Sequence, residues 1–430
     1  MEIPDGPLAY RSDQPAAPLT EEEQAILAFA ACGITGTALA DWHYGEESGG
    51  EMIARSAGRT ISSADAVHTA SVFVIDDDAT WLARRPQELP PEQLAEVIEL
   101  TREDRFVDAW RTMRVKIADS RAAPPTEPPY NLVPNEWSLY SKGTTFFLPV
   151  SSFTYAGINA GLEFLNERSG FFLLDERRMF LPAGLKDFAK SNGGHLDDDP
   201  RNGKAMPLAM FERLGGELLA VEQGMILQNL GLACQAMGLS GFPVFAAHEE
   251  SWFEALGFRM EEMPLTEYAG VPFPASTLLK VTGKNPTMRY PVGLERDGEV
   301  LLKSYAPPYY PSMEAAVHAV IEDKYGPGGI YAGGDPGVYD QRESRSGWRD
   351  PDEVGSHTPE PSKRAVEAVI AVAEYTLDRY GRYPATYPPF HTLMGFQAGH
   401  IDEGFYDTHY RPGSLSDTHR DHERRWHGQE

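Results

Sequence analysis

The sequence predicts a protein that contains both helices and strands, and three stretches carry this prediction. Ala70–Ile75 is a compact apolar run of small, β-branched and aromatic residues, which is typical of a buried strand. Residues 216–241 place apolar side chains on nearly every face of a helix, as expected of a buried central helix or a subunit interface. Residues 361–380 form an amphipathic pattern, with Val366, Val369 and Leu377 on its apolar side.

Length and charge narrow the classes of protein that fit the chain. Its 430 residues can bury a large core, and its formal charge of −26 argues against binding nucleic-acid phosphates or anionic membranes. Cys32 and Cys234 lie in apolar helical contexts that predict small core residues rather than a disulfide or a zinc site. No apolar stretch has the length of a bilayer span or the form of a signal peptide, so we expect a cytoplasmic protein.

The other elements follow in chain order from local signals. Thr20 and Glu23 form a capping box that predicts the start of a helix, which ends near Gly33. The glycine-rich stretch 34–57 predicts a loop. Further helices are expected within 90–120, at 154–167 and at 311–324, and the tail is expected to end in a charged helix at 415–426. Strands are expected at 146–150 and 242–247.

The stretch 58–75 is the most specific candidate for a binding site. Arg59 and the adjacent Ser62 and Ser63 precede the apolar run 70–75. A turn of small hydroxyl residues presents N–H groups and short side chains to a flat polar ligand, and the strand behind it holds the turn in place. An ordinary Arg–Ser surface loop ahead of a core strand explains the same residues.

Four motifs, in order along the chain, resemble the nitroreductase superfamily of flavin enzymes, and within it the azoline dehydrogenases. They are Tyr10-Arg11-Ser12 ahead of the helix that ends in Gly33-Ile34-Thr35-Gly36, the turn Arg59-Thr60-Ile61-Ser62-Ser63-Ala64, the central helix with Gln228-Asn229-Leu230 and Gly238-Leu239, and Pro291-Val292-Gly293. Together they cover about residues 8–300.

The resemblance implies an α+β fold, in which helices flank a mixed, mainly antiparallel sheet and one long helix is central. It implies a flavin-binding domain at 1–305, and we expect residues 306–430 to form a mainly helical C-terminal extension. It also implies a homodimer with FMN at the subunit interface. The expected activity is hydride transfer between the flavin and a small organic substrate, with NAD(P)H as a candidate electron donor.

The same resemblance assigns roles to individual residues. The guanidinium of Arg11 and the hydroxyl of Ser12 would contact the FMN phosphate, and Arg59 the phosphate or the ribityl chain. The remaining cofactor contacts would come from Ser62, Ser63, Ala64, Asn229, Gly238, Ser240 and Gly241. Surface or interhelix roles remain open for Arg11, Arg59 and Asn229.

The chain departs from the family pattern at three places. Asp65 stands where the relatives have glycine, so a carboxylate lies near the flavin or substrate, or crowds the ring. Met210-Phe211-Glu212-Arg213 replaces the Lys-Tyr pair of the azoline dehydrogenases, and no second arginine follows Arg11 and Ser12. Asp65 and His68 are the candidate catalytic residues, with His68 as a proton donor or as a histidine satisfied at a strand end.

The histidine-rich tail motivates a second hypothesis. His400, Glu403 and Asp407 would share one face of a helix, with His391 and His409 nearby in sequence. Imidazole and carboxylate together suit zinc, iron or manganese, although pairing on a helix surface explains the same spacing. The alternative to a flavoenzyme is therefore a flavin-free, metal-dependent lyase or hydrolase, or a ligand-binding protein, on the same scaffold.

Overall fold

A seven-stranded antiparallel sheet forms the centre of the molecule. The computed structural model describes residues 2–37, 57–63, 67–130, 138–246, 248–326 and 360–426. The strand order is β12-β17-β8-β5-β6-β7, and the short β16 pairs with the end of β8. These strands are β5 (Ala70–Ile75), β6 (Thr80–Ala83), β7 (Arg114–Ala118), β8 (Thr145–Ser152), β12 (Ser240–Phe245), β16 (Phe390–His391) and β17 (Met394–Gly399).

The predicted strand 70–75 is the buried middle of this sheet, paired with β8 on one side and β6 on the other. All six of its residues are buried. Because successive side chains of a strand point to opposite faces, Val72 and Val74 enter the core on one face, while Phe73 and Ile75 enter the core on the other. A strand covered on both faces is a continuous apolar run in the sequence, which explains why this element was predictable.

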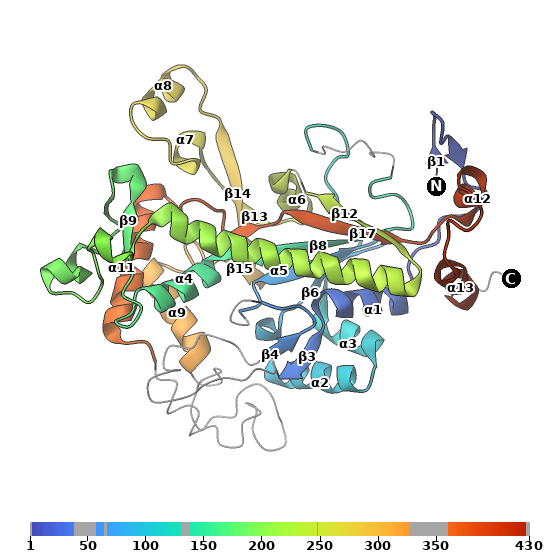
Figure 1. Cartoon of the computed structure of the whole chain (residues 1–430), viewed down its shortest axis with the longest axis horizontal. Helices are drawn as coiled ribbons and strands as arrows, with labels where there is room; N and C mark the ends of the chain where they lie inside the picture. The colour runs from blue at the N-terminus through green and yellow to red at the C-terminus, as the bar shows by residue number, and fades with distance from the viewer. Residues whose placement is uncertain are drawn as a thin grey trace.

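A 30-residue helix, α5 (Leu208–Met237), crosses one face of the sheet and is the long diagonal element in Figure 1. It starts before the predicted 216 and ends one residue before Gly238, whose left-handed conformation closes the helix. The three helices beside it are α1 (Glu21–Cys32), α2 (Pro91–Arg102) and α3 (Phe106–Met113). Both hydrogen bonds of the predicted capping box at Thr20 are present.

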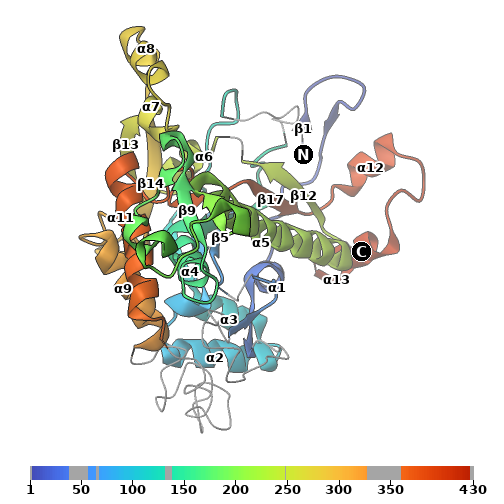
Figure 2. The same cartoon turned by 60° about the vertical axis from the view of Figure 1, so that its left-hand side comes forward.

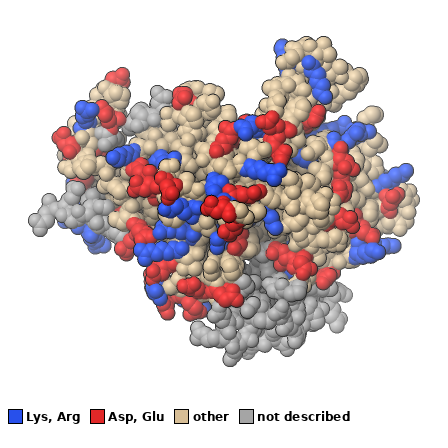
Figure 3. Space-filling model, turned by 180° about the vertical axis from the view of Figure 1, so that it is seen from behind, with Lys and Arg blue, Asp and Glu red and all other residues tan. Residues whose placement is uncertain are grey.

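The opposite face of the sheet is covered by α6 (Glu249–Ala255) and by a second antiparallel sheet of order β13-β14-β15. Its strands are β13 (Arg259–Pro264), β14 (Thr287–Arg296) and β15 (Glu299–Lys303). Two short helices, α7 (Leu265–Tyr268) and α8 (Ala275–Val281), project from this sheet in both cartoon views (Figures 1 and 2). Acidic and basic side chains are interspersed over the face seen in Figure 3.

A third core lies beside the N-terminal half of α5. It is formed by α4 (Phe153–Phe164), α9 (Met313–Tyr325), α11 (Lys363–Tyr380) and a small sheet of β9 (Phe172–Asp175), β10 (Leu181–Pro182) and β11 (Ala205–Pro207). The predicted helices at 154–167, 311–324 and 361–380 are confirmed here within a few residues.

Two short ribbons and two C-terminal helices complete the described chain. The ribbons are β1 (Glu2–Ile3) with β2 (Tyr10–Arg11), and β3 (Ile34–Thr37) with β4 (Ala57–Arg59). The stretch 34–57 was expected to be a loop, but its two ends belong to the strands of the second ribbon, in which Ile34 pairs with Arg59. The C-terminal helices are α12 (Glu403–His409) and α13 (Asp417–Trp426).

The α+β class, the antiparallel sheet and the helical C-terminal region are thus confirmed. One feature of the C-terminal region was not predicted. β17 lies between β12 and β8 in the central sheet, so the expected boundary at 305/306 falls between segments that share one sheet. Cys32 and Cys234 are free, buried core residues, as expected.

Candidate functional site

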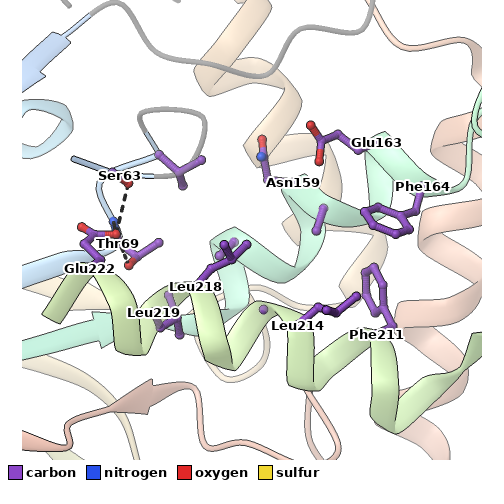
Figure 4. A pocket seen from close by; sticks show the side chains of 14 residues that line it. Ser63, Thr69, Asn159, Glu163, Phe164, Phe211, Leu214, Leu218, Leu219 and Glu222 are labelled. Atoms are coloured by element: carbon purple, nitrogen blue, oxygen red, sulfur yellow. Dashed lines mark hydrogen bonds between the residues drawn. The ribbon is translucent and has the colours of Figure 1, made fainter. Parts of the chain in front are cut away.

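A pocket lies between α4 and α5, next to the Ser62–Ser63 turn (Figure 4). Its enclosed volume is about 100 Å³, which is below the usual range for small-molecule sites, and it widens to about 630 Å³ when the space open to solvent is counted. The lining residues are Ser63, Val67, Thr69, Ala156, Asn159, Ala160, Glu163, Phe164, Phe211, Leu214, Gly215, Leu218, Leu219 and Glu222. The walls are mostly apolar, and a few polar groups converge on the space between them.

Helical periodicity explains why two segments supply most of this lining. On α4, the lining residues recur at 156, 159, 160 and 163, which is the spacing of one helix face. On α5, positions 211, 214, 215, 218, 219 and 222 follow the same rule. Small residues keep the space open, since Ala156, Ala160 and Gly215 lie where the two helices face one another.

Asn159 is the polar group of the α4 wall. Its side chain points into the pocket in Figure 4, and the residue is only 2% exposed. Within the described residues, its Oδ1 atom has no hydrogen-bond partner. A buried acceptor without a donor is unfavourable, so a ligand that brings an N–H or O–H group to this position gains a hydrogen bond that the protein alone does not make.

Glu222 is the polar group of the α5 wall, and its carboxylate holds the serine turn. One oxygen accepts from the Thr69 hydroxyl at 2.8 Å, from the Thr69 N–H at 3.2 Å and from the Ser63 hydroxyl at 3.1 Å. The other accepts from the Ala70 N–H at 3.0 Å and lies 4.0 Å from Arg59. This residue was not singled out by the sequence, although a carboxylate on a helix that is apolar all round was a signal for it.

Arg59, a predicted cofactor residue, is bound to the protein itself. Its guanidinium is buried and donates to the carbonyls of Cys32 at 3.3 Å and Ala70 at 3.0 Å. Its Nη2 atom has no acceptor among the described residues. Arg59 therefore ties α1 to the start of β5 and lies behind the turn rather than in the pocket lining. Ser62 is exposed and Ser63 lines the pocket, whereas Ala64 lies outside the described residues.

The remaining predicted contacts lie towards the C-terminal end of α5 and do not line the pocket. Asn229 donates to the carbonyls of Ala30 at 3.1 Å and Thr60 at 3.0 Å. Ser240 donates to the Gly399 carbonyl at 3.1 Å, inside the sheet pairing of β12 with β17. Gly238 closes α5, and a Cβ atom at Gly241 would meet the Phe396 ring at 2.6 Å. Each of these residues has a structural role in the chain.

Arg11 is the last residue of the β1–β2 ribbon and Ser12 follows it. The ribbon packs against α12 through Tyr10. The Tyr10 hydroxyl donates to Asp402 at 2.9 Å, and its ring contacts Phe405. The Arg11 side chain is 79% exposed and lies 3.3 Å from Glu2. In both cartoon views this ribbon is at the opposite end of α5 from α4 (Figures 1 and 2), so one protomer does not bring Arg11 to the pocket.

Of the two predicted catalytic residues, the structure describes His68. Asp65 lies outside the described residues. His68 is buried between two lining residues, Val67 and Thr69, and its backbone has a positive φ of 52°. Its N–H donates to the Ser63 hydroxyl at 2.9 Å, so His68 helps to shape the turn.

The expected helix face of His400, Glu403 and Asp407 is wrong, because α12 begins only at Glu403 and His400 precedes it. Glu403 and Asp407 instead lie 3.5 and 3.4 Å from Arg420. His391 lies 2.8 Å from Glu249. His400 joins a different group, with Glu23 of α1 and His422 of α13.

Comparisons with models of protein families, with curated proteins and with solved structures found no match. Within the described part of the chain, no helix is both long and apolar enough to cross a membrane.

Proposed function

We propose that the chain is an FMN-dependent oxidoreductase and that the pocket between α4 and α5 holds the flavin ring. The observation that carries this proposal is that Ser63, from the turn that resembles a flavin-bordering turn, lines an apolar pocket against the central helix. Phe164, Phe211 and Leu218 offer apolar surface to a flat ring. The Oδ1 atom of Asn159 offers an acceptor to a ring N–H.

The lining fits the ring better than the phosphate of FMN. Within the described residues, no lysine or arginine lines the pocket, and its two charged side chains are the carboxylates Glu163 and Glu222. A phosphate dianion close to these groups would be repelled. We therefore expect the ring to enter the pocket and the phosphate to lie outside it.

A second copy of the chain completes the site in this proposal. The exposed side of α5 carries Leu218, Val221, Met225 and Leu232, at helical spacings of three, four and seven residues. Leu218 also lines the pocket, so a partner packed on this side of α5 would cover the pocket as well. Residues on the β1–β2 ribbon, Arg11 among them, would then reach a flavin only across the subunit boundary.

The bound flavin would accept and donate the hydride, with NAD(P)H as the proposed donor and a small organic molecule as the substrate. The chain's own residues position and shield the ring. Glu222 fixes the turn at the pocket, the apolar walls exclude water, and Asn159 orients the ring edge. His68 remains the proposed proton donor, and its burial beside Thr69 keeps it close to the pocket.

An absorbance spectrum of purified protein, followed by titration with FMN and with riboflavin, tests the proposal. We expect a flavin band near about 450 nm. We also expect riboflavin to bind at least as tightly as FMN, because it lacks the repelled phosphate.

Asn159→Leu should weaken both flavins about tenfold, since one hydrogen bond is lost. Glu163→Gln should tighten FMN about two- to tenfold with little effect on riboflavin. Glu217→Gln, on the same α5 helix but outside the pocket, is the control and should change neither affinity. Colourless protein that binds neither flavin would refute the proposal.

A further inference from the structure

Three residues that are far apart in the sequence meet where α13 packs beside the end of α5. Glu23 belongs to the first turn of α1, His400 follows β17, and His422 lies in α13. Glu23 and His422 are separated by 399 residues. Figure 1 places α1 and α13 at the same end of α5. His400 reaches this end of α5 because it directly follows β17, a strand of the central sheet.

The donor atoms of the three side chains are close enough to share one ion. The Nε2 atom of His422 lies 2.7 Å from one Glu23 oxygen, and the Nε2 atom of His400 lies 3.6 Å from the other. One donor atom from each residue lies within 4.8 Å of those of the other two. Two ligands on one tetrahedral zinc ion, each bound at about 2.0–2.1 Å, are about 3.3 Å apart. The observed distances lie on both sides of that value, so small side-chain rotations are sufficient.

The surroundings favour a cation. The side chains of Glu23, His422 and His400 are 0%, 1% and 8% exposed, and a buried carboxylate is costly unless a positive charge accompanies it.

The carboxylate is also held in place by the protein. The Thr20 N–H donates to one Glu23 oxygen at 2.6 Å, as part of the capping box of α1. Metal-binding carboxylates are typically oriented by such a second hydrogen bond. Two imidazole nitrogens and one carboxylate are a recurrent ligand set for zinc and, with other geometry, for iron(II).

We propose that Glu23, His400 and His422 bind one divalent transition-metal ion of the zinc class, with a water molecule as the fourth ligand. The ion would join α1 to α13. This site is separate from the pocket between α4 and α5, so it does not depend on the proposed flavin chemistry.

The test is calorimetric titration of the full chain with Zn²⁺ after treatment with a chelator. We expect one equivalent per chain with submicromolar affinity, and a melting temperature that rises with the metal concentration. His400→Gln and His422→Gln should each weaken zinc binding at least 100-fold. His419→Gln, in the same α13 helix but outside the cluster, is the matched control and should bind zinc as the wild type does.

A measurement on the unmodified chain covers the case in which a variant does not fold. X-ray absorption of the zinc-loaded wild type should show scattering from two imidazole rings and a first shell of nitrogen and oxygen at about 2.0–2.1 Å. Failure to bind a stoichiometric equivalent, an absorption spectrum without imidazole scattering, or equal binding by folded His400→Gln and His422→Gln would each overturn the proposal.

Discussion

At the residue scale, Glu222 is the side chain on which the candidate site depends most. It is buried and accepts four hydrogen bonds from the turn and the start of β5, with Arg59 nearby. Since a buried carboxylate is stable only when donors or cations surround it, this arrangement fixes the turn against α5. Glu222 therefore both lines the pocket and stabilises the fold.

Glu222→Gln should therefore destabilise the protein by about 2–4 kcal/mol, because an amide nitrogen would face groups that are themselves donors. Urea unfolding monitored by circular dichroism measures the change. Glu217→Gln is the control, since Glu217 is exposed and forms a surface ion pair with Arg213 one helical turn away. Its expected change is within about 0.5 kcal/mol. Equal effects of the two substitutions would contradict the role assigned to Glu222.

Glu212, near the start of α5, is a second buried carboxylate, and it makes stability depend on pH. Burial raises its pKa, although hydrogen bonds from Thr386 and Ala385 act in the opposite direction. The folded chain therefore keeps this proton to a higher pH than the unfolded chain does. The contribution of Glu212 to stability is largest below the unfolded pKa, near about 4.3, and falls as the pH rises through the folded value.

Thr386→Val removes a donor to the charged form of Glu212, which should raise that pKa further. We expect a cost of about 1–3 kcal/mol at pH 8 and a smaller cost at pH 4.5, because the raised pKa leaves a larger share of the carboxyl protonated there. Denaturant unfolding at the two pH values gives both numbers. Thr282→Val, whose exposed hydroxyl bonds only within α8, should cost the same at both. A pH-independent cost for Thr386→Val would contradict the account.

At the element scale, Gly238 fixes where the C-terminal end of α5 lies. Gly238 has a φ of 85°, and its N–H donates to the Cys234 carbonyl at 2.9 Å. A Cβ atom at this position would approach the Thr418 carbonyl oxygen to 2.5 Å. Glycine is therefore required at this position for two reasons, its left-handed backbone conformation and its close approach to the first turn of α13.

Two glycine substitutions, one in α5 and one next to it, should change the free energy of unfolding in opposite directions. Gly238→Ala should cost about 1–3 kcal/mol, for a strained conformation and a close contact. Gly224→Ala should stabilise the chain by up to about 1 kcal/mol, since nothing lies within 4 Å of its added methyl group and alanine favours the helix interior. Thermal or denaturant unfolding of both variants checks the pair. A stabilising Gly238→Ala would show that the end of the helix is not fixed as described.

The elements that sequence analysis located correctly are those with local signals. The capping box at Thr20 and the apolar run 70–75 each lie within a few residues, so no knowledge of distant segments was needed. β17 was missed because a strand of six residues, three of them glycine or alanine, carries little signal of its own and is fixed by pairing with β12 and β8. His400 was also misplaced, because α12 begins only at Glu403, after the cap residue Asp402.

At the scale of the whole molecule, the candidate site is formed by segments that no local pattern could bring together. The turn at Ser63 was predicted as part of a binding site, and it does line a pocket. Asn159 and Phe164 were not predicted, because α4 reaches the pocket only through the packing of the third core against α5. The turn on one side of the pocket was predictable from the sequence, whereas the α4 wall opposite it follows only from the tertiary contacts.

The proposed dimer is also a property of the whole molecule. Leu218 and Leu232 are 52% and 59% exposed on α5, and burying this apolar surface would favour association. Leu218→Asp combined with Leu232→Asp should convert a dimer of about twice 47.6 kDa into a monomer in light-scattering measurements. Val281→Asp, at an apolar position on α8 that is even more exposed, should leave the dimer intact. A wild type that is monomeric at all concentrations would exclude the proposed interface.

The most direct test of the central claim is a fluorescence titration of riboflavin against the wild type and against Ala160→Phe. Ala160 lines the middle of the α4 wall, so a phenyl ring there fills the space assigned to the flavin ring. We predict saturable binding of one riboflavin per chain by the wild type, and at least tenfold weaker binding by a folded Ala160→Phe variant. Equal affinities for the two proteins, or no binding to the wild type, would contradict the claim that this pocket is a flavin site.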